Sequence, residues 1–197
     1  MKIVVIGGSR LIGSKLVRNF GTQGHEAVAA SPKSGVDSIT GEGLADDLKG
    51  AQVVVDVPNS PSFEEAAATE FFPDSDTQPA NLRGGCESRT SRCCVCGGNS
   101  EQSSIPYLRA KSVQEELIRR SSIPYSIVQA TQYFEFVQSI ADSATEGNKV
   151  RLPRALIQPI AADDVASAVG RVALNPALNS TIEIAGPDEF SFKELVL

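Results

Sequence analysis

A glycine-rich turn near the start of the chain has the residue types that bind a phosphate. It follows the apolar, β-branched run Lys2–Ile6 and precedes a segment whose apolar residues recur at helical spacing as far as Gly21. A turn of this kind lets a pyrophosphate approach the backbone, where helix N-terminal amides face its charge. We therefore predict that a dinucleotide binds here rather than that this is a plain strand–helix turn. The residues concerned are Gly7, Gly8, Ser9, Arg10, Leu11, Ile12 and Gly13.

A tyrosine and a lysine later in the chain could supply acid–base chemistry. Tyr107 and Lys111 are four positions apart at the start of a predicted helix, so their side chains share a face. A neighbouring ammonium lowers the pKa of a phenol and prepares it as a general acid or base. Such a pair is common by chance. The pair is more significant here because it lies one helix before the strand predicted at Tyr125–Ala130.

The elements that must position these residues alternate between strands and helices. Further strands are predicted at Ala27–Ala30, Ala51–Val57 and Thr181–Ala185, with a weak strand beginning near Val36. Helices are predicted at Glu42–Lys49, around Phe63–Phe71, at Tyr107–Arg120 and from Asp163, which is taken as an N-cap. This alternation indicates an α/β protein of Rossmann type, a doubly wound parallel sheet with helices on both faces. We expect one domain over residues 1–197.

Composition excludes several classes of function. The net charge of −6 and the single histidine argue against binding of nucleic acid, which usually requires a basic face. The N-terminal apolar run is too short for a signal peptide, and no apolar run reaches membrane-spanning length. We therefore expect a cytoplasmic protein with no nucleic-acid or membrane partner.

Several stretches together resemble one family. They are VVIGGSRLIGSKLV, VVVDVPNSPSFEE, YLRAK, IPYSIVQATQYFEF, QPIAADDVA and IEIAGPDEF. The chain resembles the atypical short-chain dehydrogenase/reductases, and among them the NmrA-like NAD(P)-binding proteins. The resemblance covers about residues 1–72 and 105–197.

The resemblance implies a nicotinamide dinucleotide, and the residues favour NADP over NAD. The family's Gly-x-x-Gly-x-x-Gly pattern maps onto Gly7 and Gly13, with Arg10 in place of the middle glycine. In related loops an arginine contacts the 2′-phosphate of NADP, a role that Arg10 could take. The second strand ends in Ser31, Lys33 and Ser34 rather than in the acidic residue that holds the ribose of NAD. The alternative is that Arg10 and Lys33 are solvated surface charges. Asn59 completes the expected cofactor-binding set.

The same resemblance assigns roles to the tyrosine–lysine pair. It implies that Tyr107 is the general acid/base, that Lys111 also holds the nicotinamide ribose, and that hydride passes between NADPH and a small carbonyl substrate. Many atypical members keep both residues without being reductases. The alternative function is therefore a non-catalytic, NAD(P)-sensing regulatory protein that binds a protein partner.

All four cysteines fall in one polar stretch where the alternation of elements requires a buried strand. Cys86, Cys93, Cys94 and Cys96 could bind zinc, but only Cys93 and Cys96 have Cys-x-x-Cys spacing. We instead interpret about residues 73–104 as a compensated frameshift. Read one nucleotide out of frame, the codons of 93–97 give mainly alanine and valine, as in a buried strand.

This interpretation has two consequences. The family's serine would fall in the slot of Val95, so the chain as written lacks it, and whether the chain turns over a substrate is left open. Arg89–Ser100 is expected outside the sheet, or as a strained strand. At the other end, Ser191 and Glu194 have capping-box spacing and open a helix that stops at Leu197, which predicts a truncated C-terminus.

Overall fold

The computed structural model describes residues 1–37, 40–57, 96–97 and 106–196 of the chain. Its longer strands are β1 (Lys2–Ile6), β2 (Glu26–Ala30), β3 (Val53–Asp56), β5 (Ser126–Ala130) and β9 (Ser180–Ile184). Its helices are α1 (Leu11–Thr22), α2 (Leu44–Leu48), α5 (Pro106–Arg120), α6 (Val137–Ser143), α7 (Ala162–Leu174) and α8 (Phe192–Val196), with 3-10 turns η1 (Pro32–Ser34) and η2 (Phe134–Phe136). Two-residue strands are β4 (Cys96–Gly97), β6 (Thr145–Glu146), β7 (Lys149–Val150), β8 (Leu156–Ile157) and β10 (Phe190–Ser191).

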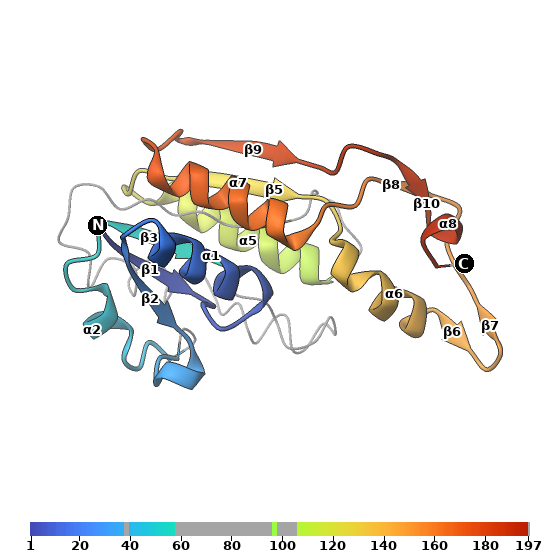
Figure 1. Ribbon diagram of the computed structural model, residues 1–197, viewed down its shortest axis with the longest axis horizontal. Coiled ribbons are helices and arrows are strands. Elements are labelled where there is room, and N and C mark those ends of the chain that lie inside the picture. Colours follow the sequence, from blue (N-terminus) through green and yellow to red (C-terminus); the bar gives the residue numbers. More distant parts are fainter. Residues whose placement is uncertain (38–39, 58–95, 98–105, 197) are drawn as a thin grey trace.

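Two parallel sheets form the frame of the molecule. One has the strand order β2-β1-β3 and the other β4-β5-β9. The short pairs β8–β10 and β6–β7 are antiparallel, and with α6 and α8 they lie beyond the carboxyl end of β9 (Figure 1). The first strand of the sequence is therefore the middle strand of its sheet, which is the arrangement that places its carboxyl end between two neighbours.

Apolar residues alternate between the two faces of these sheets, and helices cover both faces. In β1, Ile3 and Val5 pack into the core beneath α1 and α7, whereas Val4 and Ile6 pack toward α2. Helices α1 and α7 run side by side (Figure 1). In β5, Val128 joins the α7 core and the adjacent Ile127 packs against Ile118 of α5. The predicted doubly wound α/β architecture is confirmed.

The predicted weak strand near Val36 is wrong. After β2 the chain turns through η1, where Ser31 and Ser34 cap one another, and Gly35 takes a left-handed φ of +80°. The Val36 amide then donates to the Ser31 carbonyl (3.1 Å), and the Val36 side chain is buried without belonging to a strand. A local side-chain cap thus competes successfully with extension of the chain.

The N-cap assigned to Asp163 is also wrong. Helix α7 begins at Ala162, and the N-cap position is held by Ala161. The acceptor comes from η2 instead, because both carboxylate oxygens of Glu135 lie 3.0–3.1 Å from the Ala162 amide nitrogen. Asp163, within the first turn, accepts from Lys15 Nζ of α1 (2.8 Å) and so ties the two helices together.

At the C-terminal end the predicted capping box is confirmed. The Ser191 amide donates to Glu194 Oε2 (2.7 Å), and the Glu194 amide donates to Ser191 Oγ (3.3 Å). Helix α8 begins directly after Ser191. No helix in the described part of the chain is long and apolar enough to cross a membrane.

Within the expected gap in the middle of the chain, two residues do belong to the sheet. Cys96 pairs with Val128 and Gly97 with Gln129, in parallel register with β5. Of the two outcomes expected for Arg89–Ser100, a place outside the sheet is therefore wrong at these two positions. The rest of Arg89–Ser100, the predicted helix around Phe63–Phe71, and Cys86, Cys93 and Cys94 lie outside the described residues.

Candidate functional site

The predicted glycine turn joins β1 to α1. Gly7 has a φ of +79°, a conformation that favours glycine, and its amide donates to the Ala30 carbonyl at the end of β2 (2.9 Å). The Gly8 amide donates to the Val5 carbonyl (3.1 Å) and the Arg10 amide to the Gly7 carbonyl (3.0 Å). The turn is therefore tight, and it is anchored to both strands that flank it.

The other two glycines are required by close approach. A Cβ at Gly8 would lie 2.6 Å from the Ala29 Cα, and a Cβ at Gly13 would lie 2.2 Å from the Gly7 carbonyl oxygen. Gly8 thus lets the turn pack on β2, and Gly13 lets the first turn of α1 pack on the loop. The tight turn at Gly7 and the close helix packing at Gly13 are two of the reasons for glycine in a dinucleotide-binding turn, whereas Gly8 is required by packing on β2.

Arg10 occupies the place of the middle glycine without strain. Its φ of −89° and ψ of 179° are extended backbone that any side chain accommodates, and the residue is the N-cap of α1. Its side chain does not cap the helix and is exposed. The first amides of α1 have no partner within the helix, since the first helical bond is donated by Ser14. Those amides and the helix dipole suit an anion.

The predicted 2′-phosphate residues lie at the carboxyl end of β2. Ser31 is buried, and its backbone amide donates to Ser34 Oγ (3.0 Å). Lys33 is exposed in the 3-10 turn that follows. Because the turn containing Gly7 is bonded to Ala30, the residue before Ser31, these residues adjoin the glycine turn.

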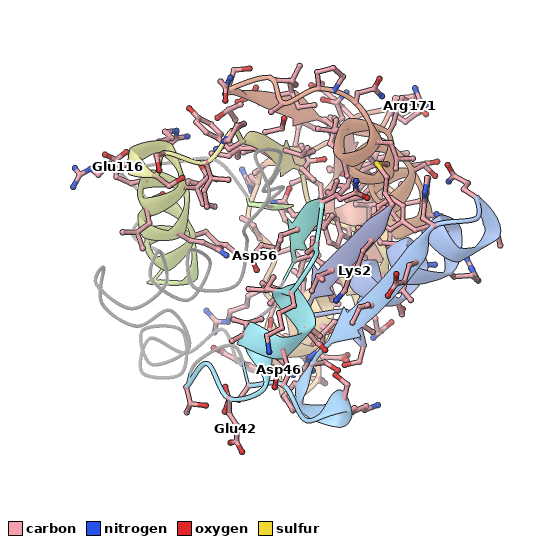
Figure 2. The ribbon with its side chains drawn as sticks, turned by 90° about the vertical axis from the view of Figure 1, so that its left-hand side faces the viewer. Lys2, Glu42, Asp46, Asp56, Glu116 and Arg171 are labelled. Carbon is pink, nitrogen blue, oxygen red and sulfur yellow. The ribbon has the colours of Figure 1, made fainter. Side chains whose placement is uncertain are left out.

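The predicted lysine lies in a buried polar cluster that the sequence analysis missed. Lys111 of α5 is 1% exposed, and its Nζ donates to Gln114 Oε1 (3.0 Å). Gln114 Nε2 in turn donates to Asp56 Oδ2 (2.7 Å). Asp56 ends β3, on the side that faces α5 (Figure 2). The one available signal was a carboxylate that ends an apolar run, Val53-Val54-Val55-Asp56.

This cluster stands next to the glycine turn. Asp56 pairs in register with Ile6, the residue before Gly7, and the Val57 amide donates to the Ile6 carbonyl (3.0 Å). In open α/β sheets ligands bind outside the carboxyl ends of the strands, and both features lie at that end of β1 and β3.

Burial raises the pKa of the Asp56 carboxyl above its usual range, and the charge of Lys111 and the hydrogen bond from Gln114 oppose that rise. The charge of Lys111 thus offsets part of the cost of removing this carboxylate from water.

The remaining residues predicted for the site are Asn59, Tyr107 and Ile12. Asn59 lies outside the described residues. Tyr107 lies in the first turn of α5, four positions before Lys111, and its side chain is outside the described part. Ile12 belongs to the apolar core, so only its backbone amide is suited to a phosphate. Among the described residues, no group of three or more histidine, cysteine or acidic side chains is placed to hold a metal ion.

Comparison with known proteins gives structures but no sequence relatives. No protein-family model matches the chain, and no curated protein matches it at a significant level. The UDP-N-acetylglucosamine 4-epimerase from Bacillus cereus superimposes with a TM-score of 0.77 at 17% identity, over 99% of this chain and 79% of that one. MoeE5 in complex with UDP-glucose and NAD gives a TM-score of 0.74 at 18% identity, over 100% and 80%.

A third structure comes from Agrobacterium tumefaciens. It is a short-chain dehydrogenase/reductase superfamily protein with bound NAD, with a TM-score of 0.70 at 16% identity, covering 100% of this chain and 81% of that one. At these identities the likeness concerns the fold. The chain has the Rossmann-type α/β fold that these three structures share.

Proposed function

We propose that the protein binds NADP and acts as an oxidoreductase-like member of the atypical short-chain dehydrogenase/reductases, passing hydride between NADPH and a small carbonyl substrate. The observation that carries this proposal is the turn between β1 and α1, where Gly7, Gly8 and Gly13 bring backbone and helix amides together beside the end of β2. The similar structures from other proteins that hold NAD support a nicotinamide dinucleotide.

The preference for NADP rests on the residues of this chain. The end of β2 carries Ser31, with no carboxylate to bind ribose hydroxyls, and the exposed cations Arg10 and Lys33 flank the same turn. A 2′-phosphate carries negative charge that two cations can neutralise, whereas the free ribose of NAD offers them only hydroxyls. NADPH should therefore bind more tightly than NADH.

Calorimetric titration tests the cofactor assignment. Arg10→Ala and Lys33→Ala should each narrow the difference in affinity between NADPH and NADH by roughly tenfold, the loss of one charge-assisted contact. Arg18→Ala is the matched control, because Arg18 is an exposed arginine of α1, two turns from the glycine loop. Its Nη2 lies 3.8 Å from Asp163 Oδ1. Equal affinities of the wild type for the two cofactors would remove the 2′-phosphate assignment.

For hydride transfer we propose Tyr107 as the general acid/base and Lys111 as the residue that holds the nicotinamide ribose. One observation favours the non-catalytic alternative, a sensor of the NmrA-like kind with a protein partner. The Lys111 ammonium is already engaged by Gln114 in a buried site, as a structural lysine would be. Steady NADPH oxidation with a panel of small carbonyl compounds favours the enzyme. Tight NADPH binding without turnover favours the sensor.

We also propose that residues 73–104 are encoded out of frame. The support for this proposal is the sequence itself, because all four cysteines fall in the polar stretch where the alternation of strands and helices requires a buried strand. The coding DNA of residues 70–106 is the direct test. A chain with the frame restored, with serine in the slot of Val95, should melt at a higher temperature and bind NADPH more tightly. A chain that is already highly stable as written, or that holds stoichiometric zinc, would contradict the frameshift.

A further inference from the structure

We infer that Asp56 and Gln114 are positioning residues for Lys111, and that together they hold its ammonium charged and in place at the carboxyl ends of β1 and β3. This inference rests on the proposed function, because it concerns the end of the binding crevice that would receive the nicotinamide ribose.

With Lys111 charged and Asp56 ionised, the hydrogen bonds of the cluster can run in one direction only. A lysine ammonium has donors and no acceptor, so the atom of Gln114 that faces it must be the carbonyl oxygen. The Gln114 amino group then faces Asp56 Oδ2, and an ionised carboxylate accepts from it. If the amide were turned over, donor would meet donor and acceptor would meet acceptor. Gln114 therefore bridges Asp56 and Lys111 through two hydrogen bonds and fixes the place of the ammonium.

Charge balance supports the same assignment. An isolated ammonium that is 1% exposed would be expelled from the interior or would lose its proton, and Asp56, itself 5% exposed, is a carboxylate of the described residues whose charge offsets it. The next carboxylate along α5 faces elsewhere. Glu115 accepts from Gln129 Nε2 of β5 (2.9 Å) and pairs with Arg119 (2.9 Å).

The strand register places this cluster beside the nucleotide turn. Asp56 is opposite Ile6, one residue before Gly7, so the carboxylate that anchors Lys111 is held by the same pair of strands that presents the glycine turn. A change at Asp56 should therefore affect the nicotinamide half of a bound cofactor and spare the adenosine half.

The first test compares two ligands. NADPH spans the whole crevice, whereas 2′,5′-ADP has the adenosine and the 2′-phosphate and lacks the nicotinamide ribose. Asp56→Asn and Gln114→Met should weaken NADPH binding by roughly tenfold or more and leave 2′,5′-ADP binding unchanged. Glu115→Gln is the matched control, a buried carboxylate-to-amide change on the same helix, and it should change neither affinity.

The second test needs no cofactor. Nitrogen NMR of the lysine ammonium groups, with the Lys111 signal assigned through Lys111→Met, follows its titration directly. In Asp56→Asn the Lys111 signal should lose its proton at a lower pH than in the wild type, because the buried charge has lost its counter-charge. If Asp56→Asn folds poorly, Asp56→Asn/Lys111→Met should recover stability, since it removes both charges of the pair.

The outcomes separate the two proposals. If the wild type bound neither NADPH nor 2′,5′-ADP, the proposed function would be overturned, and with it the role of Asp56 and Gln114 in placing Lys111 toward the cofactor. The NMR titration would still decide whether Asp56 and Lys111 form a charge pair. If the wild type bound both ligands, and Asp56→Asn changed neither the NADPH affinity nor the Lys111 titration, the positioning role alone would be overturned. Equal weakening of both ligands would overturn it too, because the variant would then act on the fold as a whole.

Discussion

The packing of helix α1 against the glycine turn makes Gly13→Ala the most informative single substitution. A Cβ at Gly13 would lie 2.2 Å from the Gly7 carbonyl oxygen, and 2.8 Å from both the Gly7 carbonyl carbon and the Gly8 Cα. All three are backbone atoms, so no side-chain rotation relieves the contact. Opening the shortest contact to 3.0 Å requires a movement of at least 0.8 Å (3.0 − 2.2) between loop and helix.

The net cost follows from two opposing effects. Overpacking of this kind costs about 1–3 kcal/mol, and rigid backbone neighbours put it toward the upper end. The better helix propensity of alanine offsets about 0.5–1 kcal/mol. We expect Gly13→Ala to lose about 2 kcal/mol of unfolding free energy, which for a chain of this length lowers Tm by about 4–8 °C.

The same helix contains the matched control. Gly21 also lies in α1, is exposed, and a Cβ there would meet nothing within 4 Å. Gly21→Ala should therefore stabilise the protein by about 0.5–1 kcal/mol, so the same substitution has opposite signs at two positions of one helix. Urea denaturation followed by circular dichroism measures both. Titration with NADPH should show roughly tenfold weaker binding for Gly13→Ala only. If Gly13→Ala were as stable as Gly21→Ala and bound NADPH equally well, the close approach of loop and helix would be refuted.

Two further predictions concern the start of helix α7. Glu135→Ala should lower the unfolding free energy by about 1 kcal/mol in urea, because the carboxylate accepts the Ala162 amide at the positive end of the helix, and an unchanged midpoint would contradict that cap. The hydrogen bond from Lys15, with the charges of Lys15 and Arg18, holds the pKa of Asp163 below its usual range. The stability that ionised Asp163 contributes is therefore present above the ordinary aspartate pKa and is lost as pH falls through the lower folded pKa. Lys15→Met should make the fall of Tm at acid pH less steep. An identical fall of Tm in the variant would count against the Lys15–Asp163 pair.

The fold was predictable because its elements differ in periodicity. Lys2–Ile6 is a buried strand in the sequence pattern and in the structure, and the helix predicted at Tyr107–Arg120 begins one residue earlier, at Pro106. Strands with apolar residues on both faces alternate with helices that have one apolar face, and this combination fits few arrangements other than a covered parallel sheet.

The errors arose where a partner distant in sequence, or a local side-chain cap, decides the outcome. Asp163 was a reasonable N-cap by residue type, but the acceptor for the first amide of α7 comes from Glu135, 27 residues earlier. The strand expected near Val36 is prevented by the hydroxyl of Ser34, which donates to the Ala29 carbonyl and bends the chain. Neither effect leaves a periodic pattern in the sequence.

Contacts between residues that are distant in sequence also decide the candidate site. Lys111 was predictable from its spacing, but its burial and its partners were not, because Gln114 and Asp56 are 58 positions apart and meet only when α5 packs beside β3. Since Asp56 is paired with the residue before Gly7, the glycine turn and the lysine share one pair of strands. Binding at the turn and placement of the lysine nevertheless concern different halves of the cofactor. Gly13→Ala, which acts at the turn, and Asp56→Asn, which acts on the nicotinamide half, should therefore be additive in NADPH affinity, because no described contact joins the two residues.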